Sequence, residues 1–535
     1  MKLIDTLTLQ LVSFSEPTPN YAILSHTWGP DNEEVSYQDM TATKRSDDTI
    51  NKPGFHKIQK TCEIARKTYG LHYAWIDTCC IDKTSSAELS EAINSMFRWY
   101  QEAIICLAFL ADVDEIEKPL VASRWFTRGW TLQELIAPQN LVFLDMTWER
   151  LGSKNELLDR VWEITGIQSS VLSGKLGLDQ VPVAVRMSWA SMRQTTRTED
   201  IAYCLMGLFG INMPMLYGEG KNAFLRLQEE IVKNNPDMSI FAWTRPHSRF
   251  AYNLHSGILA LSPQDFQQMR DITSIWTGAQ VPEFSVTNRG LKFNLHLSWG
   301  ATNGTCILPL GHGIRQEGHV GIHLRQVGNT DFVRANTSEI IPCPSEFFRA
   351  TSGKEFRVAK VLTANQCIAM YNKALRFERP GLIWTQSYSN SWYRPINIDY
   401  KIEQVRPRGI WNPVERVLYA GPNSVAIFFI HLVPKASNPE PGFVVSCCSL
   451  PNDKWLFELL PVNYWPATDH HVPALYQQLL EKEGLPVKKL YIPPVSKSGF
   501  HRLVSLSVVQ TEKENEIHTN LRLHIHQSQH PLTDT

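Results

Sequence analysis

The sequence predicts an α/β domain with a mainly parallel sheet, followed by a helical extension and a β-rich C-terminal domain. Apolar runs alternate with helical patterns over residues 1–150, and helix-like spacing of apolar residues dominates residues 151–248. Short β-like runs separated by Gly, Pro and Asn fill residues 249–535. The 535 residues are enough for about three domains, in agreement with these three zones.

The first domain is expected to alternate strands and helices. Helical spacing begins after Pro53 and again after Ser85, and a short helix is expected over residues 130–136. Strands separated by helices of this kind form parallel sheets through crossover connections. The four apolar runs that we interpret as buried strands are residues 21–25, 73–77, 103–110 and 141–144.

The spacing of apolar residues predicts helices in the extension and strands in the C-terminal domain. In the extension, acidic residues at 199–200 suit the start of a helix, and Gly207 and Gly210 are expected to mark its end. Apolar residues of a second helix recur over residues 224–231. In the C-terminal domain the β-like runs are residues 285–297, 425–433, 443–450 and 503–509.

The composition is that of an ordinary globular protein, with 43% hydrophobic and 20% charged residues. The 52 Lys+Arg and 53 Asp+Glu residues give a formal net charge of -1. Residues 1–150 are acidic, with 14 Lys+Arg and 21 Asp+Glu residues. Since proteins that bind nucleic acid carry clustered positive charge, we expect no nucleic-acid partner.

The chain is expected to be cytoplasmic, with neither a membrane span nor a metal site. Asp5 and the polar residues after it interrupt any signal-peptide core. The longest apolar runs, residues 103–110 and 425–433, are far shorter than the ~20 residues that cross a bilayer. The ten cysteines lack the spacing of zinc ligands, which indicates reduced thiols.

Common catalytic motifs are absent from the sequence, including GxxxxGK[ST], HExxH and GxSxG. Residues 218–223 match G-x-G-x-x-A, which is one form of dinucleotide-binding turn. Pro214 precedes this motif where a central strand would be needed, and proline cannot join the ladder of such a strand. We therefore interpret the glycines as a plain loop before a helix.

A candidate site is expected at the carboxyl ends of the parallel strands, where ligands of open α/β sheets bind. His26 and Trp28 follow the first predicted strand, and Asp77 ends the second. If Trp130 opens the short helix, Glu134 lies one turn further on the same face, beside the indole.

Arg124 and Arg128 precede that helix and are candidates to neutralise a bound phosphate. Another interpretation remains open: Trp130 belongs to the core, Glu134 is a surface residue or pairs with Arg128, and both arginines stack or cap. Tryptophan side chains mostly pack, and ion pairs are mostly structural.

Three blocks resemble the heterokaryon incompatibility (HET) domain of fungi: YAILSHTWG at residues 21–29, WIDTCCID at 75–82 and RGWTLQELIAP at 128–138. Residues 193–207 and 216–220 are similar to the segment that commonly continues HET proteins. The resemblance implies a protein of self/non-self recognition, in which the HET domain triggers cell death after incompatible strains fuse.

HET domains are thought to be remotely similar to TIR domains, which implies a flavodoxin-like or TIR-like fold. In TIR domains that cleave NAD, the catalytic glutamate lies in a W-x-x-E-L-like helix. The resemblance therefore implies that Glu134 is a catalytic residue and NAD a substrate, without a resident cofactor. Trp130 and Glu134 are four residues apart in this chain, in place of three.

The implied chemistry needs few groups. Cleavage of the nicotinamide–ribose bond expels a neutral pyridine, so a general acid is unnecessary. One carboxylate that stabilises the oxocarbenium-like state or holds the ribose hydroxyls suffices. Arg124 or Arg128 would hold the pyrophosphate, and Trp28 or Trp130 would stack on a ring.

Two other functions remain open. One is a non-catalytic interaction module, since a shared fold provides assembly surfaces without chemistry. The other is a chain that is silent until a partner supplies recognition. All three functions imply protein partners or self-association.

Overall fold

A computed structural model describes the chain in two units. Contacts assign residues 1–244, 259–281 and 310–318 to the first unit and the remaining residues to the second. The described residues are 1–114, 120–245, 255–274, 282–295, 297–299, 305–314, 318–327, 330–343 and 353–362, together with the strands from β18 (Ala374–Arg376) to β27 (Glu516–Ser528).

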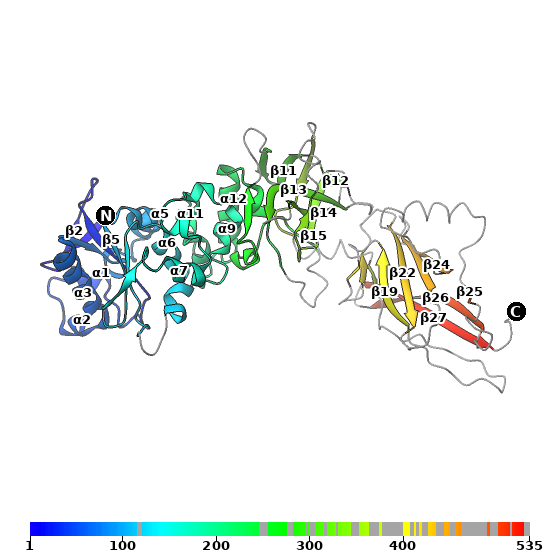
Figure 1. The fold of residues 1–535 in the computed structure, drawn as a ribbon, viewed down its shortest axis with the longest axis horizontal. Helices are drawn as coiled ribbons and strands as arrows, with labels where there is room; N and C mark the ends of the chain where they lie inside the picture. Colours follow the sequence, from blue (N-terminus) through cyan, green and yellow to red (C-terminus); the bar gives the residue numbers. More distant parts are fainter. Residues whose placement is uncertain are drawn as a thin grey trace. The chain divides into compact units, whose positions relative to one another are not determined.

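The first unit is built on a seven-stranded sheet with the order β2-β1-β4-β3-β5-β6-β7 (Figure 1). Its central strand, β3, is buried along its whole length, as the apolar run at residues 21–25 predicted. The strands are β1 (Lys2–Asp5), β2 (Leu11–Ser13), β3 (Tyr21–His26), β4 (Tyr73–Trp75), β5 (Ile105–Phe109), β6 (Leu141–Leu144) and β7 (Arg150–Ser153).

The sheet is mixed, with a parallel centre and antiparallel edges. β3 pairs in parallel with β4 and β5, and β5 pairs in parallel with β6. β1 is antiparallel to β2 and β4, and β7 is antiparallel to β6. The expected α/β domain is confirmed, but its sheet is less parallel than predicted because the edge strands β2 and β7 follow short connections, which return the chain antiparallel.

The predicted second strand is shorter than expected. The sequence predicts a strand over residues 73–77, but β4 ends at Trp75 and Asp77 begins the short helix α4 (Asp77–Cys80). Asp77 is therefore the first residue of the βα connection, at the carboxyl end of β4. Numbered along the chain, the four parallel strands have the order 2-1-3-4.

Two long helices connect the parallel strands. α3 (Pro53–Tyr69) has proline in its first turn and a left-handed glycine, Gly70, after its last residue. α5 (Ser86–Glu102) begins after Ser85, whose side chain accepts the amide of Glu88. Because β4 and β5 flank β3 on opposite sides, we expect right-handed crossovers to put α3 and α5 on opposite faces of the sheet. The short helix α6 (Thr131–Ile136) contacts both α5 and β3.

The extension consists of short helices and one longer one. The expected single helix after residue 199 is wrong, because α10 and α11 form separate turns. Gly207 lies inside α11 and only Gly210 ends it, with φ 65°. The helices are α7 (Leu158–Thr165), α8 (Ser169–Leu172), α9 (Val183–Ser188), α10 (Asp200–Tyr203), α11 (Met206–Phe209) and α12 (Asn222–Asn234).

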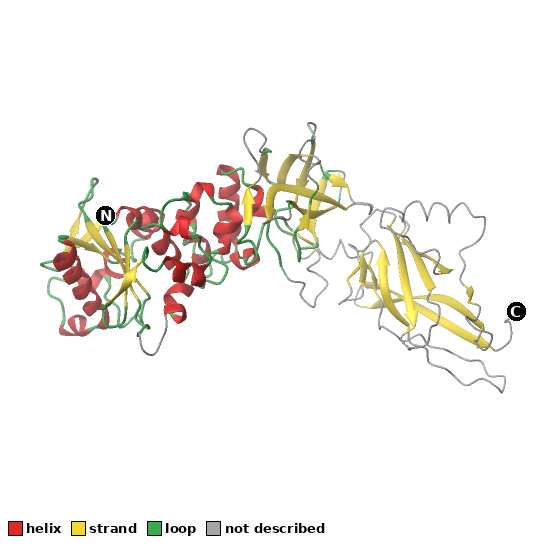
Figure 2. Cartoon of the chain, viewed as in Figure 1, coloured by secondary structure: helices red, strands yellow, loops and turns green. Residues whose placement is uncertain are grey.

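The second unit is β-rich, as predicted, and Figure 2 shows strands and loops in this part of the chain. One path of hydrogen-bonded strands runs β10-β11-β17-β15-β14. Its members are β10 (Phe284–Thr287), β11 (Gly290–Leu295), β17 (Lys354–Val358), β15 (Asp331–Ala335) and β14 (His319–Gln326).

The last strands form separate small sheets, with the orders β19-β22-β23-β24 and β25-β26-β27 among them. Their bounds are β19 (Tyr400–Arg406), β22 (Ala426–Pro434), β23 (Phe443–Ser449), β24 (Trp455–Pro461), β25 (Lys489–Ile492), β26 (His501–Lys513) and β27 (Glu516–Ser528). Within the described part of the chain, no helix has the length and apolar character needed to span a bilayer.

Candidate functional site

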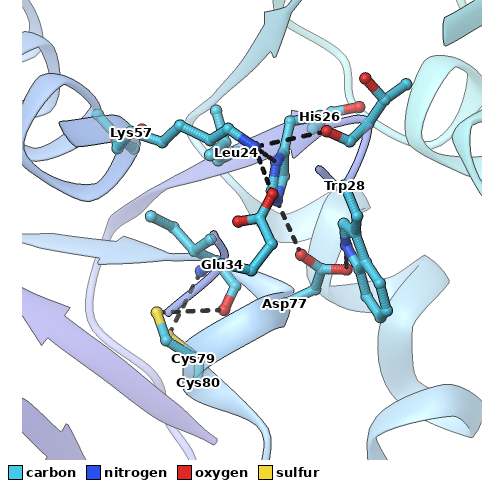
Figure 3. Close-up of polar contacts among 12 residues, drawn as sticks. Leu24, His26, Trp28, Glu34, Lys57, Asp77, Cys79 and Cys80 are labelled. Atoms are coloured by element: carbon cyan, nitrogen blue, oxygen red, sulfur yellow. Dashed lines mark hydrogen bonds and ion pairs between the residues drawn. The ribbon is translucent and has the colours of Figure 1, made fainter. Parts of the chain in front are cut away.

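Three of the predicted site residues meet at the carboxyl ends of β3 and β4 (Figure 3). The Nε2 atom of His26 lies 3.2 Å from Oδ1 of Asp77. Trp28 donates its indole N–H to the other oxygen of Asp77 at 2.8 Å. The Asp77 carboxylate is therefore held on both oxygens by residues that follow or end β3.

Lys57 of α3 supports this group from the other side of the imidazole. Its ammonium lies 3.2 Å from Nδ1 of His26 and 2.5 Å from Oε1 of Glu34. A lysine ammonium can only donate, so Nδ1 accepts and Nε2 carries the proton that is donated to Asp77. Lys57 thus sets the tautomer through which His26 binds the carboxylate.

Trp28 is the exposed member of the group. Its side chain is 40% exposed, although it is a large aromatic residue. The ammonium of Lys83 lies 3.7 Å from the centroid of its ring. An exposed indole with one edge bonded to a carboxylate is a suitable surface for stacking a planar ligand.

The surroundings of Asp77 favour its ionised form. Burial acts to raise the pKa of this carboxyl, but the hydrogen bond from His26, the nearby Lys83 cation and the bond from Trp28 outweigh it. The pKa is therefore lowered from its ordinary value. Asp77 is a carboxylate at neutral pH.

Glu134 lies deeper, with 6% of its surface exposed. Ser25 donates its hydroxyl to Oε2 of Glu134 at 2.5 Å, and the Trp125 indole donates to that hydroxyl oxygen at 2.8 Å. Burial, followed by the charge of Asp77, raises the pKa of Glu134 to about 8. Glu134 is therefore protonated at neutral pH.

The other predicted site residues are distributed differently. Arg124 is exposed, and its nearest acidic partner is Asp112, with Nε 3.7 Å from Oδ2. Trp130 lies beside Asp200 of the extension, where its indole acts to lower the pKa of that carboxyl group. Arg128 is half-buried, and its charge acts to lower the pKa of Glu134. The indole in the Glu134 network is thus that of Trp125, where the sequence predicted Trp130.

Two buried cations hold the ends of α6, which carries Glu134. Arg193 of the extension donates to the carbonyl of Arg128 at 2.7 Å and to the hydroxyl of Thr131 at 2.9 Å. At the other end, the ammonium of Lys154 donates to the carbonyls of Leu135 at 3.1 Å and Pro138 at 2.5 Å.

Sequence reasoning missed several residues of the site. The sequence could have indicated Ser25 as a site residue, because it is the one polar residue in the apolar run at residues 21–25. Lys57, Trp125, Lys154 and Arg193 gave no such indication. Each lies 16 to 100 positions along the chain from the residues to which its side chain donates, and only folding brings them together.

The glycine-rich loop before α12 is already occupied by a side chain. The Glu199 carboxylate accepts the amides of Gly218 at 2.8 Å and Gly220 at 3.0 Å. Backbone amides that a dinucleotide-binding turn would offer to pyrophosphate are thus bound to a carboxylate of the chain itself.

The adjacent cysteines in Figure 3 are buried and have a packing role. Cys79 and Cys80 are both buried in α4 and contact the backbone of Ile76. A hydrogen bond with Cys80 and burial raise the pKa of the Cys79 thiol well above its ordinary value. This thiol is not the thiolate that nucleophilic catalysis requires. In the described ranges, His, Cys, Asp and Glu form no cluster that could hold a metal.

The geometry provides two carboxyl groups in different ionisation states beside the carboxyl end of β3. Asp77 is ionised and partly accessible, with 19% of its side chain exposed. Glu134 is protonated and buried. Carboxyl pairs whose pKa values are pushed apart are typical of acid–base and glycosidic chemistry.

Residues 21–120 match the family described as heterokaryon incompatibility protein (HET), and residues 222–317 match a domain of unknown function, DUF8212. Glu134 lies beyond the end of the first match. The chain is 42% identical over 272 residues to the vegetative incompatibility protein HET-E-1 of Podospora anserina. That alignment covers 47% of this chain and 20% of the relative, so the chain spans about a fifth of the relative's length. No solved structure matches the chain.

Proposed function

The chain is a HET domain-containing protein, and on that premise we propose that it acts in fungal vegetative incompatibility and triggers cell death when incompatible strains fuse. The similarity to a vegetative incompatibility protein at 42% identity supports this role. Within it, we propose that the α/β domain cleaves NAD to nicotinamide and ADP-ribose.

The observation that carries the proposed activity is the Glu134–Ser25 pair beside the ionised Asp77. In this proposal the neutral carboxyl group of Glu134 holds the ribose hydroxyls, and Trp28 stacks on a ring of the substrate. Arg128 is the arginine proposed to hold the pyrophosphate, because Arg124 is directed to Asp112. The parallel strand order 2-1-3-4 supports a flavodoxin-like or TIR-like fold, in which ligands bind at this edge.

Self-association is part of the proposal. Glu134 is only 6% exposed, so α6 must move before a ribose can reach it. Helix α6 has six residues and is held mainly by tertiary contacts, which allows such a movement. Contact between copies of the chain would select the open position.

The alternative is a non-catalytic assembly module in the same death pathway. The burial of Glu134 under Ser25 and Trp125 favours this alternative, because a core carboxyl group has no access to substrate. The two functions differ in what happens to NAD.

The test uses the full chain fused to an inducible dimeriser, with NAD concentration and cell viability followed together in fungal cells. We expect dimerisation to deplete NAD and kill the cells, and Glu134→Ala, which removes the group proposed to hold the ribose, to abolish both effects. Glu91→Ala, a change at an exposed glutamate of α5, is the matched control and should behave like wild type. Killing without NAD loss in both wild type and Glu134→Ala would establish the assembly module instead.

A further inference from the structure

We propose that Asp77 is a second catalytic residue of this site, the carboxylate that accepts the proton of the attacking water. This inference rests on the proposed NAD cleavage and divides its chemistry between two carboxyl groups. It goes beyond the assignment of Asp77 as a substrate-binding residue.

The first argument is position. Asp77 begins α4 at the carboxyl end of β4, and His26 ends the neighbouring parallel strand β3. The side chain of Asp77 is 19% exposed, so it meets solvent where Glu134 does not. Of the two carboxyl groups, Asp77 is the one that a water molecule beside a bound ligand can reach.

The second argument is the pattern of donors around Asp77. His26 and Trp28 each bind one oxygen, and every carboxylate oxygen has a second lone pair that remains for water. Lys57 fixes the imidazole in the tautomer that donates to Asp77. A chain of donors that orients one carboxylate is the arrangement expected for a general base.

The third argument is the charge around Asp77. The hydrogen bonds from His26 and Trp28 and the Lys83 cation favour its ionised form, and Glu134 can remain beside it because it is neutral. The titratable groups that act on Asp77 or are acted on by it are His26 on β3, Lys83 after α4, Glu134 on α6, Cys79 on α4 and Tyr100 on α5.

The proposed step balances without another reactant. The C1′–N bond to the pyridinium breaks, and its electron pair neutralises the ring nitrogen, so nicotinamide leaves uncharged. The negative charge of Asp77 stabilises the oxocarbenium-like ribose. Water then forms the new C1′–O bond and passes one proton to Asp77, which releases it to solvent. The products are ADP-ribose, nicotinamide and one proton.

An ionised Asp77 that acts as base and a neutral Glu134 that binds the ribose together predict a bell-shaped dependence of kcat on pH. Activity falls at low pH as Asp77 becomes protonated, and it falls again at higher pH as Glu134 ionises. A single essential carboxylate at Glu134 would instead make activity rise as Glu134 ionises.

The experiment measures steady-state NAD hydrolysis by the purified, dimerised full chain. We expect Asp77→Asn to lower kcat by about 100-fold or more, with KM changed much less, as loss of a general base does. Asp82→Asn, five residues further along the chain, is the matched control and should keep wild-type kcat. Circular dichroism and the unfolding temperature establish that each variant is folded.

A second variant keeps the carboxylate and the aromatic ring. Trp28→Phe removes the N–H donated to Asp77, so the pKa of Asp77 rises and the acid limb of the kcat profile moves up by about one pH unit. A purely structural role for Asp77 would leave this limb in place.

The outcomes separate this inference from the proposed function. If the dimerised wild type leaves NAD intact, the proposed cleavage fails and Asp77 loses its catalytic role with it. If wild type cleaves NAD while Asp77→Asn retains kcat, or while Trp28→Phe leaves the acid limb unmoved, only the assignment of Asp77 is overturned.

Discussion

Asp77 and Glu134 are chemically similar side chains that carry different charges at neutral pH. Two hydrogen-bond donors and the nearby Lys83 cation lower the pKa of Asp77, whereas burial raises the pKa of Glu134 to about 8. The nearby ionised Asp77 contributes to the second effect, since two close carboxyl groups do not readily ionise together. Ionisation at this site is therefore decided by burial together with the donors and charges around each carboxyl group.

The raised pKa of Glu134 has a consequence for stability. The ordinary pKa of a glutamate is 4.5, so between about pH 4.5 and 8 the folded state binds a proton that the unfolded state has released. The stabilisation is complete below pH 4.5 and is lost as pH rises through about 8. We expect the free energy of unfolding of wild type to fall across this range, by an amount on the order of a few kcal/mol.

Glu134→Gln should remove that slope, because the amide does not titrate. Urea unfolding of both proteins at pH 5.5, 7 and 8.5 measures the difference, and Glu91→Gln should keep the wild-type slope. Parallel pH dependences of wild type and Glu134→Gln would contradict a buried, protonated Glu134.

At the scale of elements, α6 is a short helix that depends on its supports. Isolated helices below about 12–15 residues are marginal in water, and α6 has six residues. Its last carbonyls are satisfied by the ammonium of Lys154, and its first turn is joined to the extension through Arg193. The position of Glu134 is therefore set partly by residues far from it in sequence.

Lys154→Met should weaken this support. Methionine fills similar space but leaves the carbonyls of Leu135 and Pro138 buried without their donor, which costs roughly 1–3 kcal/mol. We expect lower stability in urea and faster amide hydrogen exchange over residues 131–137. Lys175→Met at an exposed site is the control, and unchanged exchange over α6 in Lys154→Met would show that the lysine is dispensable.

At the scale of the molecule, the extension and the α/β domain belong to one folded unit. The amide of Gly129 donates to the carbonyl of Gln194 at 2.8 Å, beside the parallel bridge between Arg128 and Gln194. A β-carbon on Gly207 would lie 2.2 Å from the β-carbon of Phe97 in α5. The two parts pack so closely that glycine is required at this contact.

Gly207→Ala should therefore destabilise the whole unit and not the extension alone. The added methyl group overpacks the contact between α11 and α5, which typically costs about 1–3 kcal/mol. Thermal unfolding followed by circular dichroism should show a lower midpoint for the unit. Gly29→Ala, whose added carbon would meet only side-chain oxygens at 3.5 Å, is the control. An unchanged midpoint in Gly207→Ala would mean that α11 shifts freely on α5.

Local sequence patterns predicted much of the first unit. The runs at residues 21–25 and 141–144 became β3 and β6 because burial on both faces requires continuous apolar residues, and this requirement is visible in any short window. The edge strands β2 and β7 were missed because they are short and partly exposed, so they lack such a run. The split between α10 and α11 was missed because the helical period continues across it.

The sequence by itself determined that His26, Trp28 and Asp77 would meet, because residues that follow parallel strands collect at one edge of the sheet. Only the tertiary structure decided that Glu134 lies under Ser25, that Trp125 supplies the indole, and that Arg124 turns to Asp112. The physical reason is that the direction and ionisation of a side chain depend on packing between segments about 100 residues apart, such as β3 and α6, which no local pattern records.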